Sequence, residues 1–332
     1  MFARRLVLPF VILVAIILSA CGGTTTATST KYTGTIHISS STWTGYAVLY
    51  VAKAKGTWKT HGLDVDFKVV EDPNDRFIAM AAGRLEGMAT TVDTYARQQS
   101  AGVPAVEIFP IDASVGGDGI LASKSIKTVG DLKGKSIAVN QGSVSEFFLA
   151  QVLQANGMSL KDVKELNMKS GEAGAAFVAG RVDVAVTWEP WLSKAPKQRA
   201  DTQILVSSKQ YPDLIMDSFG FRKEFIQKYP DTVKEFMRAY YDAFDWMKKN
   251  PAEANKIIGD AVGESADDVK ADLDTIVMYD LTMGKKIMGT SSAHGKIYDT
   301  AKAAADFWKS LGKIDTVMNL NDAIDPSFIN SL

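Results

Sequence analysis

Two tryptophans and a carboxylate stand together at the end of the run Val182–Trp191, which reads Val-Asp-Val-Ala-Val-Thr-Trp-Glu-Pro-Trp. An aromatic face can stack on a flat ligand and a carboxylate can accept hydrogen bonds or pair with a cation, so Trp188 and Glu189 are candidate ligand-binding groups. The alternating valines before them predict a strand, which must stop near Glu189 because Pro190 lacks an N–H. Ligands bind at this end of strands in open α/β sheets.

The other candidate groups also stand at the carboxyl ends of predicted strands or at the starts of predicted helices. Such positions bring side chains from separate segments to one edge of a sheet. The set holds three carboxylates and three aromatic side chains but no Lys or Arg. The predicted ligand-binding residues are Thr42, Trp43, Tyr46, Thr91, Asp93, Asp118, Gln141, Ser143, Ser145, Thr187, Trp188 and Glu189.

Simpler roles compete for some of these residues. Asp93 could cap the helix that follows its strand, and Asp118, which stands between glycines, could shape a turn. One of Trp188 and Trp191 is expected in the core, and Trp191 is favoured because it follows the proline. Trp43 is the strongest candidate, since an exposed Trp before a helix would otherwise leave apolar surface in water.

A faint internal repeat organises these groups. Ile36–Gly56 and Ile137–Gly157 each read as a strand, a polar turn and a helix, with the same separation at both ends. Ala81–Asp93 and Val178–Glu189 each read as a helix ending at Gly, then Arg, then a short strand with Thr and an acidic residue. Gly after a helix is the usual left-handed cap. The repeat predicts two similar lobes that face each other.

Strands alternate with helical patterns as far as about residue 206, which predicts mostly parallel α/β sheets. Gly116–Gly119 breaks this pattern and suits a crossing between lobes, because glycines allow unusual backbone angles. The polar stretch Gln210–Phe221 is taken as the return crossing. The predicted first lobe is therefore 35–117 and 219–332, and the predicted second lobe, with the crossings, is 118–218.

Helices are predicted in both parts of the first lobe. Asn74–Ala82 is expected to place Phe77, Ile78 and Ala81 on one side. The helices predicted after the return crossing are Pro230–Lys249, Pro251–Ala261, Ala266–Met278 and Ile297–Leu311.

The composition argues against several classes of protein. Lys and Arg number 37 against 38 Asp and Glu, a net charge of −1, so no basic field points to nucleic acid. The three histidines pair neither with one another nor with Cys at metal-ligand spacing, and no serine elbow or phosphate loop occurs. We therefore expect a binding protein rather than an enzyme, with no cofactor, metal or nucleic-acid partner.

The amino terminus predicts export. Arg4 and Arg5 precede an apolar run from Leu6 to Ala20, which is short for a membrane span but suits a signal peptide. The run ends in Leu-Ser-Ala-Cys, which resembles a bacterial lipobox. By that resemblance, residues 1–20 are a lipoprotein signal peptide, and Cys21 carries acyl chains such as palmitate that hold the protein at the extracytoplasmic face of the cell membrane. Residues 21–34 are then a flexible tether.

Several segments together resemble one family. With the lipobox, they are Asp131–Val139, Gly142-Ser143, Ala179–Asp183 and Thr187–Trp191, and they resemble the solute-binding proteins of nitrate, sulfonate and taurine importers. Fungal thiamine-pyrimidine synthase and bacterial pyrimidine- and riboflavin-binding proteins belong to the same group. The resemblance covers essentially the whole mature chain. It implies a type II periplasmic-binding fold, with two α/β lobes, two hinge crossings and a ligand trapped as the lobes close.

The candidate residues rank the family's ligands. Buried carboxylates would repel a bare anion such as nitrate, which ranks last. A flat neutral heteroaromatic such as riboflavin or a thiamine pyrimidine could stack on Trp43 or Trp188, and this class is favoured. The alternative is taurine or another sulfonate, since the ammonium of taurine could pair with Asp93, Asp118 or Glu189.

The resemblance also implies partners. A monomer should bind a small ligand and present it to the permease and ATPase subunits of an ABC importer. Two other functions stay open: an enzyme like the thiamine-pyrimidine synthases, which the export signal disfavours because those relatives are cytosolic, and a sensor or adhesive surface lipoprotein on the same scaffold.

Overall fold

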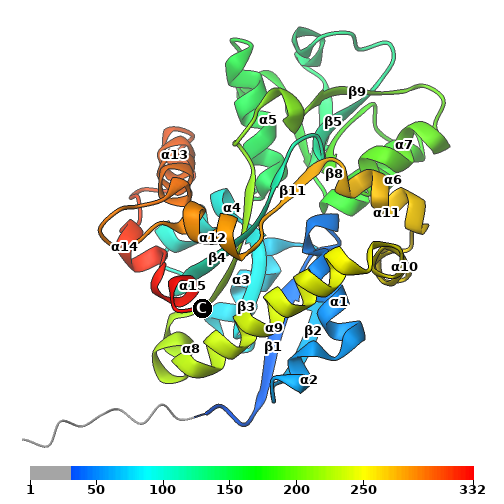
Figure 1. Ribbon diagram of the computed structural model, residues 1–332. Helices are drawn as coiled ribbons and strands as arrows, with labels where there is room; N and C mark the ends of the chain where they lie inside the picture. Colours follow the sequence, from blue (N-terminus) through cyan, green and yellow to red (C-terminus); the bar gives the residue numbers. More distant parts are fainter. Residues whose placement is uncertain (1–30) are drawn as a thin grey trace, which may run out of the picture.

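Two β-sheets organise the protein (Figure 1). The structure, a computed structural model, describes residues 31–332. Within these residues one sheet has the strand order β11-β4-β10-β3-β1-β2 and the other has the order β7-β6-β8-β5-β9. The strands are β1 (Thr35–Ser40), β2 (Asp64–Val69), β3 (Gly87–Thr91), β4 (Ala105–Ser114), β5 (Asp118–Ser123), β6 (Ser136–Val139), β7 (Lys164–Asn167), β8 (Val184–Trp188), β9 (Thr202–Ser207), β10 (Met216–Arg222) and β11 (Ile276–Met278).

Helices cover both faces of each sheet, and their starts carry recognisable signals. Asp72 and Ser143 cap α3 and α5 by accepting hydrogen bonds from backbone N–H groups at 2.9 and 3.2 Å. Pro230 and Pro251 open α9 and α10, where a missing N–H costs little. The α-helices are α1 (Ala47–Lys55), α2 (Thr57–Thr60), α3 (Pro73–Ala81), α4 (Val92–Ser100), α5 (Val144–Ala155), α6 (Ser170–Val178), α7 (Trp191–Gln198), α8 (Lys223–Lys228), α9 (Pro230–Lys249), α10 (Pro251–Val262), α11 (Ala266–Leu273), α12 (Leu281–Met288), α13 (Lys296–Ser310), α14 (Leu320–Ala323) and α15 (Ser327–Asn330).

The first lobe is built on the sheet that contains β1. On one face of this sheet, Ile38 of β1 packs in the same cluster as Val48 of α1 and Phe236 of α9. On the other face, Phe77 of α3 and Tyr95 of α4 belong to a separate buried cluster. Side chains alternate between the two faces of a strand, so each strand of this sheet can contribute side chains to the packed clusters on both faces. Each large apolar side chain buried in this way contributes about 1.5–3 kcal/mol.

The second lobe uses bulky residues on one face of its sheet and alanines on the other. Val184 and Val186 of β8 join the cluster that contains α5, while Ala185 between them joins the cluster formed with α6 and α7. Ala138 of β6 pairs with Ala185 in the parallel ladder. These small residues let α6 and α7 lie close to the sheet.

The predicted internal repeat is matched by equivalent strand positions in the two sheets. β1 lies between β2 and β3 in the first lobe, and β6 lies between β7 and β8 in the second. Next to β3 lies the antiparallel strand β10, and next to β8 lies the antiparallel strand β5. The prediction of two similar α/β lobes is therefore confirmed.

The return to the first lobe differs from the prediction. β10 begins at Met216, within the segment predicted to be a crossing, and lies between β3 and β4. The first sheet thus resumes before the predicted boundary at residue 219. Asp217 and Ser218 gave this segment a polar, turn-like pattern, but both are buried and hydrogen-bonded in the sheet. The crossings lie at 115–117 and 208–215.

Two helical predictions also need correction. The helix predicted over Ala266–Met278 ends at Leu273, because β11 follows and pairs with β4. Ile276 is buried while Val277 is 41% exposed, a two-residue alternation that indicates a strand. In α3, Ile78 is 61% exposed although it was placed with the apolar side; Phe77 and Met80 form the buried side instead.

The start of the described chain is attached to the first lobe. The backbone N–H of Tyr32 donates to Thr232 Oγ1 at 3.1 Å. The centroid of the Tyr32 ring lies 5.1 Å from that of the Phe225 ring and 4.8 Å from that of the Tyr229 ring. The predicted signal peptide and the lipidation site Cys21 lie outside the described residues.

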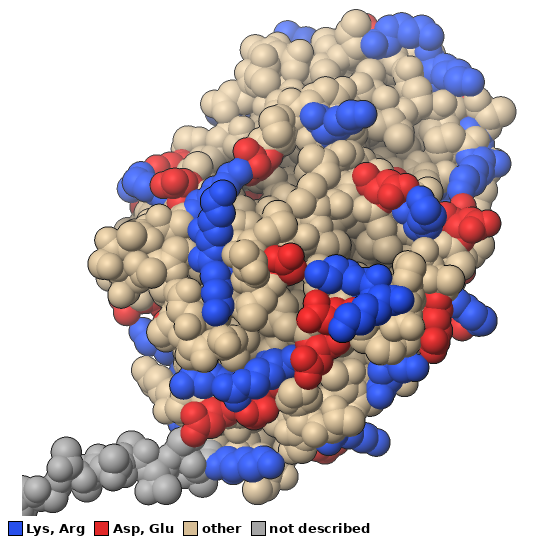
Figure 2. Space-filling view, viewed as in Figure 1, with Lys and Arg blue, Asp and Glu red and all other residues tan. Residues whose placement is uncertain are grey.

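Charged side chains are mixed over the surface. Figure 2 shows Lys and Arg interspersed with Asp and Glu on the visible face, with no broad field of one sign. Among residues 31–332, no helix has the length and apolar character needed to cross a membrane.

Glu107 of β4 is fully buried within the first lobe. Ser218 donates to its Oε2 at 2.5 Å, and Oε1 has no hydrogen-bond partner. Burial raises the pKa of Glu107 to about 8, against the opposing effect of the Ser218 hydrogen bond. The folded pKa lies above the unfolded one, so between these two values the folded state keeps a proton that the unfolded chain loses. The free energy of unfolding therefore falls progressively as pH rises from the ordinary glutamate range to about 8.

We predict that Glu107→Gln raises the free energy of unfolding at pH 9 by roughly 2 kcal/mol or more, because the variant has no charge to bury. At pH 4, below the ordinary glutamate pKa of about 4.3, Glu107 is mostly protonated in both states, so the gain should be small. Urea unfolding from pH 4 to pH 9 measures both values. An equal effect at all pH values would mean that Glu107 does not titrate on unfolding.

Candidate ligand-binding site

A small cavity lies between the two lobes. Both sheets contribute to its wall, mainly through the carboxyl ends of strands and the starts of helices. This agrees with the edge at which open α/β sheets bind ligands. The residues that line the cavity are Ser41, Trp43, Tyr46, Pro73, Arg76, Thr90, Thr91, Thr94 and Asp217 from the first lobe, and Asp118, Ser143, Val144 and Trp188 from the second.

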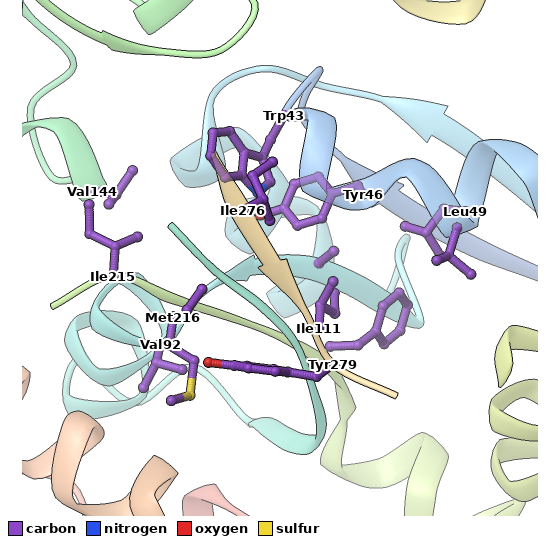
Figure 3. Close-up of a cluster of buried hydrophobic side chains, with 14 of the residues drawn as sticks. Trp43, Tyr46, Leu49, Val92, Ile111, Val144, Ile215, Met216, Ile276 and Tyr279 are labelled. Atoms are coloured by element: carbon purple, nitrogen blue, oxygen red, sulfur yellow. The ribbon is translucent and has the colours of Figure 1, made fainter. Parts of the chain in front are cut away.

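Half of the residues selected from the sequence stand in this wall. Trp43, Tyr46 and Val144 belong to one cluster of buried side chains, which Figure 3 shows around β11. The predicted residues that line the cavity are Trp43, Tyr46, Thr91, Asp118, Ser143 and Trp188. Those outside the lining are Thr42, Asp93, Gln141, Ser145, Thr187 and Glu189.

Hydrogen bonds within the protein occupy several of the residues outside the lining. Ser145 Oγ lies 3.0 Å from Ser170 Oγ, and Thr187 Oγ1 donates to the backbone oxygen of Ser170 at 2.9 Å. Glu189 accepts from the backbone N–H of Ser193 at 2.8 Å, at the start of α7. These side chains hold β8, α5 and α6 together beneath the cavity.

Asp93 is buried in the first turn of α4, but the cap position before that helix is Thr91. Thr94 Oγ1 donates to its carboxylate at 3.3 Å, while Oδ1 has no hydrogen-bond partner. Burial raises the pKa of Asp93 to about 6. Its backbone oxygen accepts from Trp308 Nε1 at 3.0 Å, which joins α4 to α13.

Two rows of paired residues bring polar groups to the cavity. In the first sheet, Asp217 of β10 lies opposite Thr91 of β3 on one side and Asp112 of β4 on the other. In the second sheet, Asp118 lies opposite Trp188. Directly paired residues of antiparallel strands project from the same face of the sheet, so the side chains of each row point to the same side.

Aromatic donors meet the carboxylates of the first row. Trp43 Nε1 lies 3.3 Å from both carboxylate oxygens of Asp112, and the hydroxyl of Tyr46 donates to Asp217. Burial raises the pKa of Asp217 to about 7 and that of Asp112 well above its usual range, the latter with help from the nearby charge of Asp217. Burial likewise raises the pKa of Asp118 well above its usual range. At neutral pH the three groups therefore do not all carry a negative charge.

Arg76 is the main feature that the sequence did not reveal. It lies on α3, is 3% exposed, and donates from Nη1 to the backbone oxygen of Ala89. Its Nε has no hydrogen-bond partner among the described residues. A charged guanidinium is rarely buried without a partner, and burial lowers its pKa. The cavity wall therefore contains a cationic side chain, whereas the residues selected from the sequence included no Lys or Arg.

Asp217 was missed because its strand was taken as a crossing, and Arg76 because it sits mid-helix among polar neighbours. The apolar pair Phe77 and Met80 was a usable signal for Arg76. That pair defines the buried side of α3, and position 76 lies beside it on the helix.

A pair of buried serines lies at the crossings, with Ser114 at the end of β4 and Ser208 at the start of the second crossing. Ser114 Oγ lies 2.8 Å from Ser208 Oγ, and Ser208 Oγ accepts from the N–H of Gly116 at 2.7 Å. Ser114 Oγ accepts from the N–H of Asp118 at 3.1 Å. The backbone of the hinge is thus satisfied by side chains of the hinge itself.

Trp43 is held against this hinge. A Cβ on Gly117 would collide with Cη2 of the indole, and a Cβ on Gly45 would collide with its Nε1 and with the Asp112 carboxylate. Both glycines are needed for the ring to occupy its place in the cavity wall.

We predict that Gly117→Ala lowers the free energy of unfolding by about 1–3 kcal/mol, because the added methyl overpacks a rigid site. The displaced indole should also change the tryptophan emission spectrum of the ligand-free protein. Gly130→Ala is the matched control, since its Cβ would meet nothing nearer than 3.6 Å. If both variants behave like the unchanged protein, Trp43 does not pack on the hinge.

Comparison with known proteins agrees with the fold. The profile of the family described as NMT1/THI5 like matches residues 43–254. A Bacillus subtilis protein provisionally assigned as an aliphatic-sulfonate-binding protein is 28% identical over 328 residues, 96% of this chain and 95% of the relative. The taurine-binding periplasmic protein of Escherichia coli is 26% identical over 284 residues, 81% of this chain and 85% of the relative.

A solved structure shows the same two-lobed architecture. The alkanesulfonate-binding protein SsuA from Xanthomonas axonopodis pv. citri, bound to MOPS, superimposes with a TM-score of 0.76 over 89% of this chain and 99% of that one, at 18% identity. The chain has the α/β periplasmic-binding fold and belongs to the NMT1/THI5-like family.

Proposed function

We propose that this protein binds a small organosulfonate between its lobes and presents it to an ABC importer, with an aminoalkanesulfonate such as taurine as the first candidate. The observation that carries the proposal is Arg76, a buried guanidinium in the cavity wall with an unpartnered Nε. This replaces the flat vitamin as the favoured ligand, and takes up the alternative that the sequence left open.

The anionic end of such a ligand has suitable partners in the cavity. Arg76 supplies a positive charge, and planar guanidinium groups suit oxyanions. Ser143 caps the twelve-residue helix α5, whose first residue, Val144, also lines the cavity, so the positive end of the helix dipole faces the site. The hydroxyl of Thr90, which also lines the cavity, provides a further donor.

The cationic end would meet Asp118 and Asp217. Both line the cavity, and both have pKa values raised by burial. A ligand ammonium beside them would favour their ionised form and offset the burial penalty. A zwitterion therefore satisfies both kinds of charge in one small space.

Other ligand classes leave part of this wall without a partner. A bare anion such as nitrate would match Arg76 but not the carboxylates. A neutral vitamin without a suitable acceptor would leave the Nε of Arg76 unpartnered, and the Trp43 N–H is already engaged with Asp112. The two curated relatives, named for sulfonate and taurine binding, support the same class.

We predict that taurine raises the melting temperature in a thermal-shift panel that also contains ethanesulfonate, nitrate and riboflavin. Asp118→Asn should weaken taurine binding by about 10- to 100-fold, because a charged hydrogen bond is lost, but leave ethanesulfonate binding within a few-fold. Calorimetry of both ligands measures the difference. Trp246→Ala is the control, since Trp246 lies on α9 outside the cavity.

A shift with riboflavin alone would restore the stacking hypothesis. A shift with nitrate alone would mean that the carboxylates do not face the ligand.

We also infer that the protein is a monomer anchored through a lipidated Cys21 on the outer side of the cell membrane. Cys21→Ser should move the protein from the membrane fraction to the soluble fraction of cells and abolish incorporation of labelled palmitate, because no acyl chain remains to insert. Ligand affinity should be unchanged. Membrane retention of the variant would contradict the anchor.

A further inference from the structure

A second group of buried carboxylates lies between the lobes, outside the ligand cavity. Glu189 follows β8 of the second lobe, while Glu264 and Asp272 come from α11 and the turn before it in the first lobe. All three are buried: Glu189 is 5% and Asp272 1% exposed, and the Glu264 side chain is 1% exposed. None of them lines the ligand cavity.

Few donors face this group. The N–H of Ser193 donates to Glu189 at 2.8 Å, and Thr44 Oγ1 lies 3.5 Å from Asp272 Oδ2. Neither carboxylate oxygen of Glu264 accepts a hydrogen bond, and Asp272 Oδ1 accepts none either. Buried carboxylate oxygens without donors are costly when ionised.

Two lysines of α7 are the cations that face the group from the second lobe. Lys194 Nζ lies 3.4 Å from Glu264 Oε1, and Lys197 is engaged by Asp268 on the exposed side of α11. The acidic groups that act on one another are Glu189, Glu264 and Asp272, and Glu189 also acts on Asp118. On the buried side, one lysine, Lys194, faces three carboxylates, which leaves an excess of negative charge if all three are ionised.

A metal ion does not resolve that excess. Among residues 31–332, no group of three or more His, Cys, Asp or Glu side chains is arranged to hold one. Protons remain as the means of neutralisation. Burial, followed by the charges of neighbouring carboxylates, raises the pKa of Asp272 to about 9, and burial raises that of Glu189 to about 7.

Closure is what brings these groups together, because Glu189 belongs to one lobe and its two acidic neighbours to the other. We propose that lobe closure takes up protons at Glu189 and Asp272, beside the buried Glu264, so that rising pH opens the protein and releases its ligand. Separation of the lobes returns the carboxylates to water, where their ordinary pKa values favour the charged form at neutral pH. By linkage, closure is then favoured at low pH and loses stability as pH rises through the folded values.

The proposal is independent of the ligand, so it is tested in the ligand-free protein. In a Cys21→Ser background, Lys161→Cys on the second lobe and Lys249→Cys on the first place two exposed labelling sites, and energy transfer between dyes reports the closed fraction. We expect the closed-to-open ratio to fall between pH 5 and pH 9.5, by up to about tenfold per pH unit for each proton released.

The double variant Glu264→Gln/Asp272→Asn should flatten this dependence and keep the lobes closed at high pH. Circular dichroism checks that the variant is folded, and Glu189→Gln, on the opposite lobe, gives a second test that should reduce the pH slope. Asp268→Asn is the matched control: it breaks an exposed ion pair across the same boundary but leaves the buried group intact.

A closed fraction that does not change with pH in the unchanged protein would overturn the proposal. So would a double variant, or a Glu189→Gln variant, that keeps the full dependence. Failure of taurine to bind would leave these measurements unaffected, so the two proposals fail separately.

Discussion

Burying carboxylates where two lobes meet is the constraint on which the rest of the site depends. An isolated charge in a dry interior is strongly unfavourable, so each carboxylate needs a donor, a cation or a proton. Trp43 and Tyr46 meet this need at Asp112 and Asp217, and both aromatic side chains thereby acquire fixed positions in the cavity wall. The contacts that stabilise the acids therefore also give the cavity its shape.

The hinge is subject to a related constraint. Its backbone leaves both sheets, so its N–H groups lose their ladder partners and must find others. Ser114 and Ser208 accept hydrogen bonds from the N–H groups of Asp118 and Gly116, and their own hydroxyls connect the end of β4 to the start of the second crossing. Both serines are fully buried, so the point where the two chain segments meet is shielded from water.

Much of the architecture was accessible from the sequence because it rests on local signals. Alternating valines, helix-starting prolines and the repeated strand–turn–helix pattern are short-range features, and they located most strands and helices. The same reasoning placed Trp43, Trp188 and Asp118 at strand ends, where they line the cavity.

The rest depends on contacts between distant segments. In the sequence, the polar residues of β10 resemble a turn. The structure shows that they are buried and hydrogen-bonded to Tyr46 and Glu107. Arg76 looks like a surface residue of a helix until β3 is placed beneath it. A buried polar group is recognisable only with its partner, and these partners come from remote parts of the chain.

Tyr32 carries a mechanical consequence. Its ring and backbone attach the beginning of the described chain to α8 and α9 of the first lobe. Any force transmitted through the preceding residues therefore acts on that lobe alone. If the amino terminus is held, the first lobe is therefore held with it. The second lobe, which the chain enters and leaves only through the two crossings, is then the lobe that moves during closure.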